Sequence, residues 1–438
     1  MFNSDAHVES RRSFLAKTAA LAGAGALVAA AGTSHARPVP VKGLSRPPLE
    51  EGGVIKIGVI GTGGMGTGHC DGFINSANAG AEKVQIVAVC DVCQSHLDRA
   101  YDKCVKGQKD VAVERTTDYR KVLAREDIHG VLIATPEHWH SKMAIDAIAA
   151  GKDVYIEKPM TLRLEEAVTL HDTALANPST IVQIGTQQVR LPKFIEAQKL
   201  IAQGMIGTPT MSQTSYCRNN KEGEWLYYAI DPAWEPGKNL DWDAWCGPLG
   251  KIPWDPQFFA RWRRYRAFST GIIGDLLVHV LTPLMYAVDA GWPTRVTCAG
   301  GHYVDKVMEN HDTINMTIEF EKGHTMIVAG STNNETGLEV LIRGHKGNVY
   351  LGGRHCVVRP ERIFSEELES KTIQCDDIGN DQDQHRLGWL RSIRTREKPI
   401  ADVVLSTKVM VAVDLATRSA WDGHAYKFDP ATMKALRV

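Results

Sequence analysis

Near the start of the chain runs the stretch Lys56-Ile57-Gly58-Val59-Ile60-Gly61-Thr62-Gly63-Gly64-Met65-Gly66. Its first five residues are mostly apolar and β-branched, as in a buried strand, and a G-x-G-x-x-G turn follows directly. In such a turn Gly61 permits the sharp change of direction, Gly63 lets the backbone approach a pyrophosphate, and Gly66 allows the next helix to pack closely. The N–H groups at the start of that helix face the negative charge. The stretch therefore predicts a dinucleotide-binding domain of the Rossmann type.

Short β-branched runs and amphipathic segments alternate through the first part of the chain. The runs are Val54–Ile60, Val84–Val89, Gly130–Ala134, Asp153–Ile156 and Thr180–Ile184, and the clearest helical patterns are Ser141–Ala150 and Leu164–Ala176. Strands that alternate with helices form parallel sheets, because a parallel connection needs a crossover. Residues 54–185 are therefore predicted to form a doubly wound parallel sheet.

After Gly185 the pattern changes, and residues 186–438 are predicted to form a second domain for substrate binding and oligomerisation. A helix over Lys193–Gln203 leads into an aromatic, loop-rich stretch from Tyr216 to Phe268, and a closing helix is expected over about Ser406–Trp421. Alternating runs lie between them, at Thr294–Ala299, Thr313–Phe320, Thr325–Gly330, Glu339–Arg343 and Asn348–Leu351. Such alternation is typical of antiparallel strands with one covered face. The fold class is therefore α/β, with a Rossmann domain followed by an α+β domain built on a large, mostly antiparallel sheet.

The first 36 residues have the pattern of a twin-arginine export signal. Arg11 and Arg12 precede an apolar stretch from Thr18 to Gly32, and Ser34-His35-Ala36 resembles a cleavage site. A retained membrane helix is the weaker alternative, because the apolar stretch is shorter than the ~20 residues that cross a bilayer, and a disordered tail is a further alternative. Residues 37–53 are rich in proline and are predicted to be a linker. The sequence thus predicts a protein exported to the periplasm, with no membrane association after cleavage of the signal.

Composition excludes several kinds of partner and site. The 438 residues carry a formal charge of -1, so nothing in the overall charge favours nucleic acid or an anionic membrane. The nine cysteines are odd in number and scattered, which does not suggest a disulfide framework. Cys90 and Cys93 spell C-x-x-C, but no second pair of ligands accompanies them, so we expect packing residues and no metal site.

The residue after the second predicted strand indicates which nucleotide is bound. Asp91 can accept hydrogen bonds from both hydroxyls of the adenosine ribose and would repel a 2′-phosphate, which favours NAD over NADP. Arg99 lies close to Asp91 in sequence, so the binding of NADP stays an alternative. Twin-arginine signals mark proteins that are exported already folded, so we expect NAD to leave the cytoplasm tightly bound.

Taken together, five further motifs resemble one family, the Gfo/Idh/MocA oxidoreductases, which include glucose–fructose oxidoreductase and inositol dehydrogenase. The resemblance covers most of the mature chain. It comprises Ala134-Thr135-Pro136-Glu137-His138-Trp139-His140, Glu157-Lys158-Pro159, Gly185-Thr186-Gln187-Gln188, Gly274-Asp275-Leu276-Leu277-Val278-His279 and Arg391-Ser392-Ile393-Arg394. Glu-Lys-Pro after the fourth strand is the most diagnostic, because ligands bind at the carboxyl edge of such a sheet.

The resemblance implies roles for individual residues. Lys158 would lie beside the nicotinamide and the substrate hydroxyl as a polarising donor, and His279 would be the general base. Asp275, four residues before His279 and on the same face of a helix, would bind substrate and orient the imidazole. The cofactor contacts would come from Gly61, Gly63, Gly64, Met65, Gly66, Asp91, Thr135, Pro136, His140, Glu157, Lys158 and Gln187. Glu137 departs from the family, since many members have asparagine at this position. Whether residue 137 contacts the ribose is therefore left undecided by the sequence.

The aromatic stretch before the predicted catalytic helix could supply a wall for a sugar. It contains Trp225, Trp234, Trp242, Trp245, Trp254, Trp262, Tyr227 and Tyr228. Aromatic side chains also form cores and interfaces, so each single tryptophan has a structural alternative. Trp262, Arg263 and Gln188 are the candidates for substrate contacts, and Arg263 or Arg266 could hold a polar or anionic substituent.

Three functions are compatible with these residues. The first is an NAD-dependent oxidoreductase acting on a secondary hydroxyl or ketone of a sugar, glycoside or cyclitol. The second is glycoside hydrolysis through transient oxidation, elimination, addition of water and re-reduction, as in N-acetylgalactosaminidases related to this family, which often depart from Glu-Lys-Pro. The third is a nucleotide-bound binding protein without activity. The family resemblance also implies a homo-oligomer, a dimer or a tetramer.

Overall fold

A computed structural model of the chain describes residues 42–44 and 49–438. The predicted export signal, residues 1–36, lies outside the described residues, as does most of the predicted linker. Among the helices of the described residues, none combines the length and the apolar character needed to cross a membrane.

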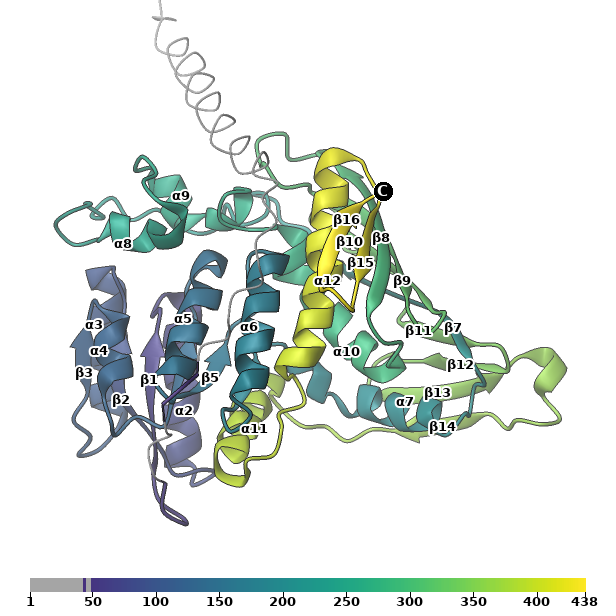
Figure 1. Cartoon of the computed structure of the whole chain (residues 1–438), viewed down its shortest axis with the longest axis horizontal. Helices are drawn as coiled ribbons and strands as arrows, with labels where there is room; N and C mark the ends of the chain where they lie inside the picture. The colour runs from purple at the N-terminus through teal and green to yellow at the C-terminus, as the bar shows by residue number, and fades with distance from the viewer. Residues whose placement is uncertain (1–41, 45–48) are drawn as a thin grey trace, which may run out of the picture. The chain divides into compact units, whose positions relative to one another are not determined.

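Within residues 49–438, the first sheet has six parallel strands in the order β3-β2-β1-β4-β5-β6 (Figure 1). The strands are β1 (Ile55–Ile60), β2 (Val84–Cys90), β3 (Glu114–Thr116), β4 (Gly130–Ile133), β5 (Asp153–Ile156) and β6 (Val182–Ile184). This order is that of a doubly wound dinucleotide-binding fold, with its switch point between β1 and β4. The predicted Rossmann sheet is therefore confirmed.

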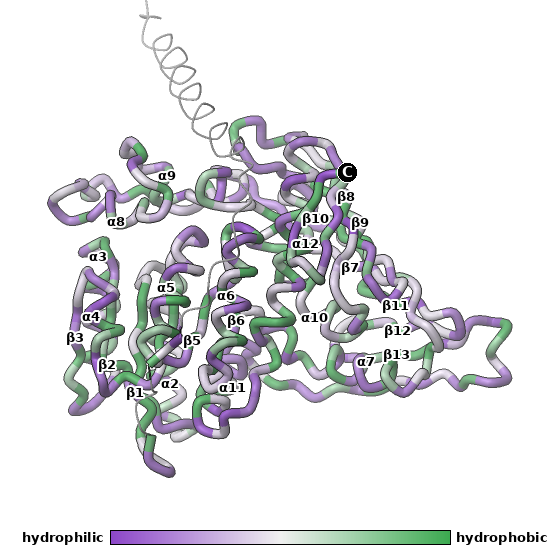
Figure 2. The backbone as a smooth tube through the Cα atoms, in the orientation of Figure 1, coloured by the Kyte–Doolittle hydropathy of each residue, from purple (hydrophilic) through white to green (hydrophobic). Residues whose placement is uncertain are grey.

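Helices on both faces bury five of these strands almost completely, whereas the edge strand β3 is exposed at two of its three residues. These helices are α2 (Gly64–Asn78), α3 (Gln94–Gly107), α4 (Tyr119–Ala124), α5 (Glu137–Ala149) and α6 (Leu164–Ala176). All four residues of β4 are buried, and the hydrophobic courses of β1 and β2 are visible in Figure 2. Strands covered on both faces have near-continuous apolar sequences, which explains why their positions could be predicted.

A second sheet contains ten strands in the described range, in the order β14-β13-β12-β11-β7-β10-β9-β8-β15-β16. Its strands are β7 (Pro209–Cys217), β8 (Pro293–Gly301), β9 (Thr313–Phe320), β10 (Thr325–Ser331), β11 (Leu341–Gly344), β12 (Gly347–Tyr350), β13 (His355–Pro360), β14 (Lys371–Gln374), β15 (Tyr426–Asp429) and β16 (Lys434–Arg437). β7 and β10 run parallel, and the other neighbouring pairs are antiparallel. Helices α7 (Pro192–Ala202), α10 (Val278–Val288) and α12 (Val403–Asp422) pack against it. The predicted large, mostly antiparallel sheet is confirmed.

The central strand β7 has no counterpart among the runs predicted from sequence. Its inward-facing side chains include Ser212 and Thr214, which are buried although they are polar. Ser212 Oγ lies 2.8 Å from His324 Nε2, so its hydroxyl is satisfied inside the protein. A strand whose buried face carries hydroxyls does not show the apolar alternation that identifies strands in a sequence.

Helix α11 (Asp381–Thr395) follows the strands β7–β14 in sequence but packs against the Rossmann sheet. Trp389, Leu390 and Ile393 are fully buried in the same cluster as the apolar residues of β1. Arg394 donates to Glu82 and Arg396 to Asp153, both in the Rossmann part of the chain. The nucleotide-binding domain is thus completed by a segment that comes nearly 200 residues after its last strand.

The residues 218–268, called the aromatic loop below, carry the helices α8 (Trp242–Cys246) and α9 (Pro256–Ala260) and have a small core of their own. At one end, the aromatic loop is hydrogen-bonded to the start of α3, which follows β2, where Gln94 N donates to Asn239 O at 2.8 Å. At the other end, it is bound to α5, where Trp139 Nε1 donates to Trp245 O at 2.9 Å. The aromatic loop therefore crosses the carboxyl ends of the Rossmann strands, as the positions of α8 and α9 in Figure 1 show.

Removing the Trp389 side chain should destabilise the whole protein. Trp389 is fully buried against Phe73 and Tyr155, and a large cavity would remain. We expect Trp389→Ala to lower the free energy of unfolding by about 3–5 kcal/mol, measured by chemical denaturation. Leu436→Ala, on an exposed position of β16, should change it by less than ~0.5 kcal/mol. Similar small losses in both variants would contradict the described packing of α11.

Candidate functional site

A cavity of about 650 Å³ lies at the carboxyl edge of the Rossmann strands, beneath the aromatic loop. Its size is in the range of pockets for small ligands and cofactors. The wall brings together residues that are distant in sequence: Gly61, Gly63, Asp91, Thr135, Lys158 and Arg263. The glycine turn and the Glu-Lys-Pro loop therefore face the same space.

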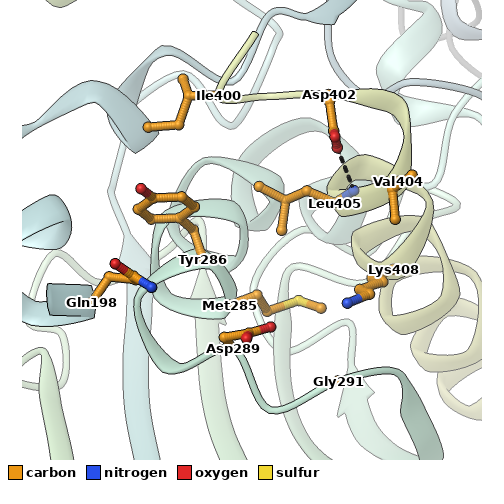
Figure 3. Close-up of a pocket in the computed structure, with 10 residues that line it drawn as sticks. All are labelled: Gln198, Met285, Tyr286, Asp289, Gly291, Ile400, Asp402, Val404, Leu405 and Lys408. Atoms are coloured by element: carbon orange, nitrogen blue, oxygen red, sulfur yellow. Dashed lines mark hydrogen bonds between the residues drawn. The ribbon is translucent and has the colours of Figure 1, made fainter. Parts of the chain in front are cut away.

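A smaller pocket of about 270 Å³ lies between α10 and α12 (Figure 3). Its charged groups already have structural partners. The carboxylate of Asp402 accepts from Leu405 N at 2.8 Å and so caps α12, and Lys322 donates to the carboxylate of Asp289 at 3.2 Å. The larger cavity is therefore the candidate site.

The glycine turn has the geometry that a pyrophosphate requires. Gly61 has a φ of +83°, and a Cβ at Gly66 would lie 1.9 Å from the carbonyl oxygen of Gly61, so a side chain at either position would be excluded. α2 begins at Gly64 without a side-chain cap or an acidic residue in its first turn. Its first N–H groups and the positive end of its dipole thus remain available to an anion, and these residues fit the dinucleotide.

Asp91 closes the other side of the turn. Its carboxylate accepts from Thr62 N at 2.7 Å and from Cys93 N at 2.8 Å. Oδ2 also accepts from Thr62 Oγ1 at 3.4 Å, whereas Oδ1 keeps a second lone pair and can still accept from a ribose hydroxyl in the cavity that Asp91 lines. Burial raises its pKa, against the opposite effect of His96. Arg99 donates to the backbone oxygen of Thr62 at 3.2 Å.

A buried chain of hydrogen bonds supports the Glu-Lys-Pro loop from behind. Arg386 of α11 donates to His69 Nδ1 at 3.1 Å, and because a guanidinium can only donate, that nitrogen must be the acceptor. His69 Nε2 therefore carries the proton and donates to Glu157 at 2.8 Å. Burial alone would raise the pKa of Glu157, but the bond from His69 and nearby positive charge outweigh it and lower the pKa to about 2. The other oxygen of Glu157 accepts from Lys158 N at 3.2 Å.

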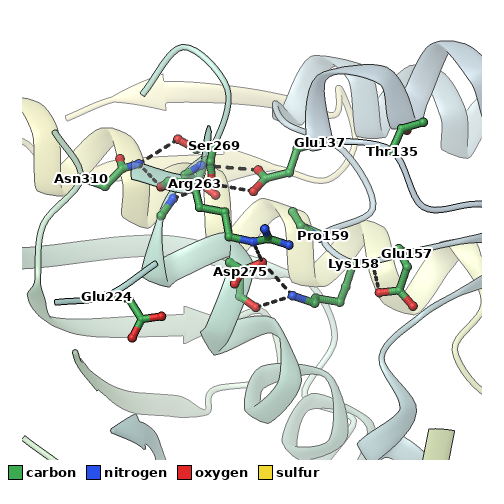
Figure 4. Close-up of polar contacts among 12 residues, drawn as sticks. Thr135, Glu137, Glu157, Lys158, Pro159, Glu224, Arg263, Ser269, Asp275 and Asn310 are labelled. Carbon is green, nitrogen blue, oxygen red and sulfur yellow. Dashed lines mark hydrogen bonds and ion pairs between the residues drawn. The ribbon is translucent and has the colours of Figure 1, made fainter. Parts of the chain in front are cut away.

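Lys158 and Arg263 converge on the carboxylate of Asp275 (Figure 4). Lys158 Nζ and Arg263 Nε each lie 2.8 Å from the same oxygen, Oδ1, and Lys158 also donates to the backbone oxygen of Asp275 at 2.9 Å. Burial would raise the pKa of Asp275, but Arg263 and Lys158 outweigh it and hold the pKa well below its usual range. The site therefore contains a permanent carboxylate between two cations.

His279 lies in the first turn of α10 and does not belong to the cavity wall formed by the described residues. Burial, then the charge of Lys158, lowers its pKa to about 4, so the imidazole is neutral at pH 7. Its Nδ1 is buried with no hydrogen-bond partner in the described part of the chain, and its ring centroid is 6.2 Å from that of Tyr216.

The structure does not form the expected bond between Asp275 and His279. No hydrogen bond joins them within residues 49–438, where the carboxylate of Asp275 is bonded to Lys158 and Arg263. The physical reason is that two cations, Lys158 and Arg263, attract the carboxylate more strongly than a neutral imidazole does. Asp275 itself lies in a π-helical turn, Ile273–Leu277, directly before α10.

Glu137, the departure from the family pattern, is fully buried at the first position of α5. It accepts from Ser269 Oγ at 2.6 Å and so holds the loop that precedes the π-helical turn. Burial and the nearby charge of Asp275 raise its pKa to about 8, against the bond from Ser269. Glu137 is therefore mostly neutral at pH 7.

The remaining predicted residues divide into two groups. Gly64, Met65, Pro136, Glu157 and Trp262 join those already placed on the cavity wall. His140 is buried behind it, with ring nitrogens 2.7 Å from Pro159 O and 2.8 Å from Thr135 O. Gln187 and Gln188 form a 3-10 turn after β6 and do not belong to the wall formed by the described residues.

Several residues of the cavity wall were not predicted from sequence. His96, Trp139 and Phe259 all line it, and the ring of His96 stacks on that of Phe259 at 5.6 Å between centroids. For Phe259 the aromatic richness of the loop is the signal that could have indicated it, although it does not say which rings face the cavity. No local signal marks His96 in α3 or Trp139 in α5 as wall residues.

Two regions of the chain match one protein family. Residues 55–186 match the group described as "Oxidoreductase family, NAD-binding Rossmann fold", and residues 249–428 match "Oxidoreductase family, C-terminal alpha/beta domain". The chain belongs to the Gfo/Idh/MocA oxidoreductases. The match to the NAD-binding domain includes the glycine turn and the Glu-Lys-Pro loop that line the cavity below the aromatic loop.

Curated relatives of the chain include glycoside hydrolases. A glycosyl hydrolase family 109 protein of Shewanella baltica is 31% identical over 243 residues, which cover 51% of each chain. An alpha-N-acetylgalactosaminidase of Shewanella oneidensis is 30% identical over 200 residues, 43% of this chain and 42% of that protein. The matches thus span about half the length of these relatives.

Solved structures of similar fold include sugar dehydrogenases. Levoglucosan dehydrogenase, in complex with NADH and levoglucosan, has a TM-score of 0.62 at 18% identity, covering 88% of this chain and 99% of that one. Myo-inositol 2-dehydrogenase from Lactobacillus plantarum also has a TM-score of 0.62, at 16% identity, covering 86% and 100%. At such low identity these similarities concern the fold.

Glu137 should make stability fall with rising pH. Its pKa is about 8 in the folded protein and near the ordinary 4.5 in the unfolded chain, so folding favours the protonated form in between. The contribution of protonated Glu137 to the free energy of unfolding is fully present below about pH 4.5. It is lost as the pH rises towards 8, by at most about 1.4 kcal/mol per pH unit. Glu137→Gln should abolish this fall and be the more stable protein at pH 8, in denaturation curves measured from pH 5 to 9. Parallel pH dependence in the variant and the parent would contradict the assignment, and exposed Glu335→Gln is the control.

Proposed function

We propose that this protein transfers a hydride between NAD and a secondary hydroxyl or ketone of a sugar, glycoside or cyclitol. The observation that carries the proposal is the cluster of Lys158, Asp275 and Arg263, which adjoins the nucleotide cavity at the end of β5. The fold shared with levoglucosan dehydrogenase and myo-inositol 2-dehydrogenase supports a polyhydroxylated substrate.

Each residue of the cluster has a chemical role in this proposal. NAD, when bound, supplies an acceptor for the hydride. Lys158 is held by Asp275 with its ammonium group at the cavity, where it would polarise the substrate oxygen and stabilise negative charge that develops there. His279, neutral at pH 7, would take the hydroxyl proton. Asp275 holds the Lys158 ammonium in position and thus acts on the substrate oxygen through it.

We further propose that NAD is preferred over NADP and stays bound. The preference is supported by the buried carboxylate of Asp91, which would repel a 2′-phosphate. Retention is supported by the aromatic loop, which is bound on both sides of the cavity that it covers. A retained nucleotide suits export in the folded state, and the twin-arginine pattern at Arg11 and Arg12 is the basis for proposing a periplasmic location.

Glycoside hydrolysis without net redox change is a second candidate, favoured by the family 109 relatives. In that reaction the sugar is oxidised, the aglycone is eliminated, water is added and the hydride is returned. The retained Glu157-Lys158-Pro159 sequence tilts the choice towards the oxidoreductase. Both reactions use the same first step and differ in whether an aglycone is released.

Optical measurements on the purified protein separate the two reactions. We expect free sugars, glycosides or cyclitols to change the absorbance of bound nicotinamide stoichiometrically, without release of aglycone. Release of aglycone with no lasting change of absorbance would instead identify the hydrolase.

His279→Ala should lower turnover by at least about 100-fold, the scale of general base catalysis, while the nucleotide remains bound. Full activity of that variant would exclude His279 as the base.

A change at Gly247 should release the nucleotide. Gly247 has a φ of +47°, and a Cβ there would lie 2.0 Å from the ring of Trp139, where the aromatic loop is bound to α5. We expect Gly247→Ala to retain at least about tenfold less NAD after dialysis, measured by chromatography of the released nucleotide. Gly250→Ala is a matched control, because Gly250 also has a positive φ but open space around its Cβ position. Equal retention in both variants would show that the loop does not hold the nucleotide.

A further inference from the structure

We propose that Arg263 binds a carboxylate of the substrate, so that the preferred substrates are sugar acids or their glycosides and not neutral sugars. This inference rests on the function proposed above, because it names the substrate class of the same site. It is carried by the hydrogen bonding of Arg263, by the charged groups around it and by its distance from Lys158.

Arg263 presents unused donors to the cavity in a defined orientation. Its Nε is bonded to Asp275 Oδ1, and its guanidinium carbon lies 4.1 Å from the centroid of the Trp262 ring and 5.7 Å from that of Tyr228. These contacts fix the plane of the group. Its two terminal nitrogens have no hydrogen-bond partner among the described residues, although the side chain is only 21% exposed. Two parallel N–H groups on a fixed plane match the geometry of a carboxylate.

The neighbouring arginines are satisfied within the protein, which makes Arg263 different. Arg218 binds the carboxylate of Glu224 through two nitrogens, one of them at 2.9 Å. Arg264 binds that of Asp305 at 2.7 Å and 3.0 Å. Arg263 instead shares the single oxygen Oδ1 of Asp275 with Lys158.

Arg263 shares its bonded carboxylate with a second cation. Within the described residues, Asp275 Oδ1 accepts from both Arg263 and Lys158. The ionised Glu157 is bonded to His69 and to the backbone N–H of Lys158, and Glu137 is mostly neutral at pH 7 because burial raises its pKa to about 8. An anionic group on the substrate would give Arg263 a carboxylate that it does not share.

The distance between the two cations suits a single sugar ring. Lys158 Nζ and Arg263 Nε each lie 2.8 Å from one oxygen, so they are less than about 6 Å apart. A six-membered ring can therefore place a secondary hydroxyl at Lys158 and a carboxylate at the outer edge of Arg263. The ring of Trp262, which also lines the cavity, offers an apolar face beside that position.

Matched pairs of ligands test the inference on the protein with its nucleotide bound. We would titrate glucuronate against glucose, galacturonate against galactose, and the methyl glycosides of each, and measure binding by tryptophan fluorescence as well as kcat/KM. In at least one pair the acid should bind about tenfold more tightly, the scale of one charged hydrogen-bonding partner, and its affinity should fall with added salt. Arg263→Gln should remove this preference by raising KM for the acid, and Arg263→Lys should keep part of it.

Controls keep the inference separate from folding and from the proposed reaction. Arg359→Gln removes an exposed arginine of β13 and should keep the preference for the acid. Retention of NAD by Arg263→Gln would show that the variant is folded. Neutral sugars that bind and react as well as the acids in every pair would overturn the inference and leave the oxidoreductase standing. Acids that bind through Arg263 but are not oxidised would support the inference and contradict the proposed reaction, whereas absence of binding in every pair would overturn the inference.

Discussion

The ion pair cluster centred on Asp275 is the interaction on which the site depends. Its carboxylate joins three segments: Lys158 from the end of β5, Arg263 from the aromatic loop, and the π-helical turn that carries Asp275 itself. Each segment belongs to a different layer of the fold, and each brings a charge that would be costly to bury alone. The same carboxylate therefore pairs with two cations and brings the Rossmann edge and the second sheet into one site.

The nucleotide-binding half could be predicted from sequence because its signals are local. Strand β1 and the turn from Gly61 to Gly66 follow from a continuous apolar run and three glycines, and neither needs information from elsewhere in the chain. The same holds for Lys158, whose neighbours in sequence set its place at the sheet edge. The second sheet was recognised less completely, since buried hydroxyls such as Ser212 hide β7 from any pattern based on hydrophobicity.

Residues whose roles come from tertiary contacts could not be found in this way. A spacing of four between Asp275 and His279 indicates one helical face, but it cannot show that Lys158 and Arg263, from other parts of the chain, bind the carboxylate instead. Arg386 acts on His69 across 317 residues of sequence and His69 acts on Glu157 across 88, and no local pattern marks such partners. Glu137 was recognised as a departure from its family, but its contact with Ser269 required the fold.

The position of α11 has a consequence for the order in which this protein is made. The Rossmann strands leave the ribosome early, yet the side chains that cover one flank of their sheet, Trp389 and Leu390, are synthesised close to the end. Until then the nascent domain exposes an apolar surface and lacks the arginine that orients His69. A fragment ending after β6 would therefore be an incomplete domain, whose sheet could complete its packing only once residues 381–395 had been synthesised.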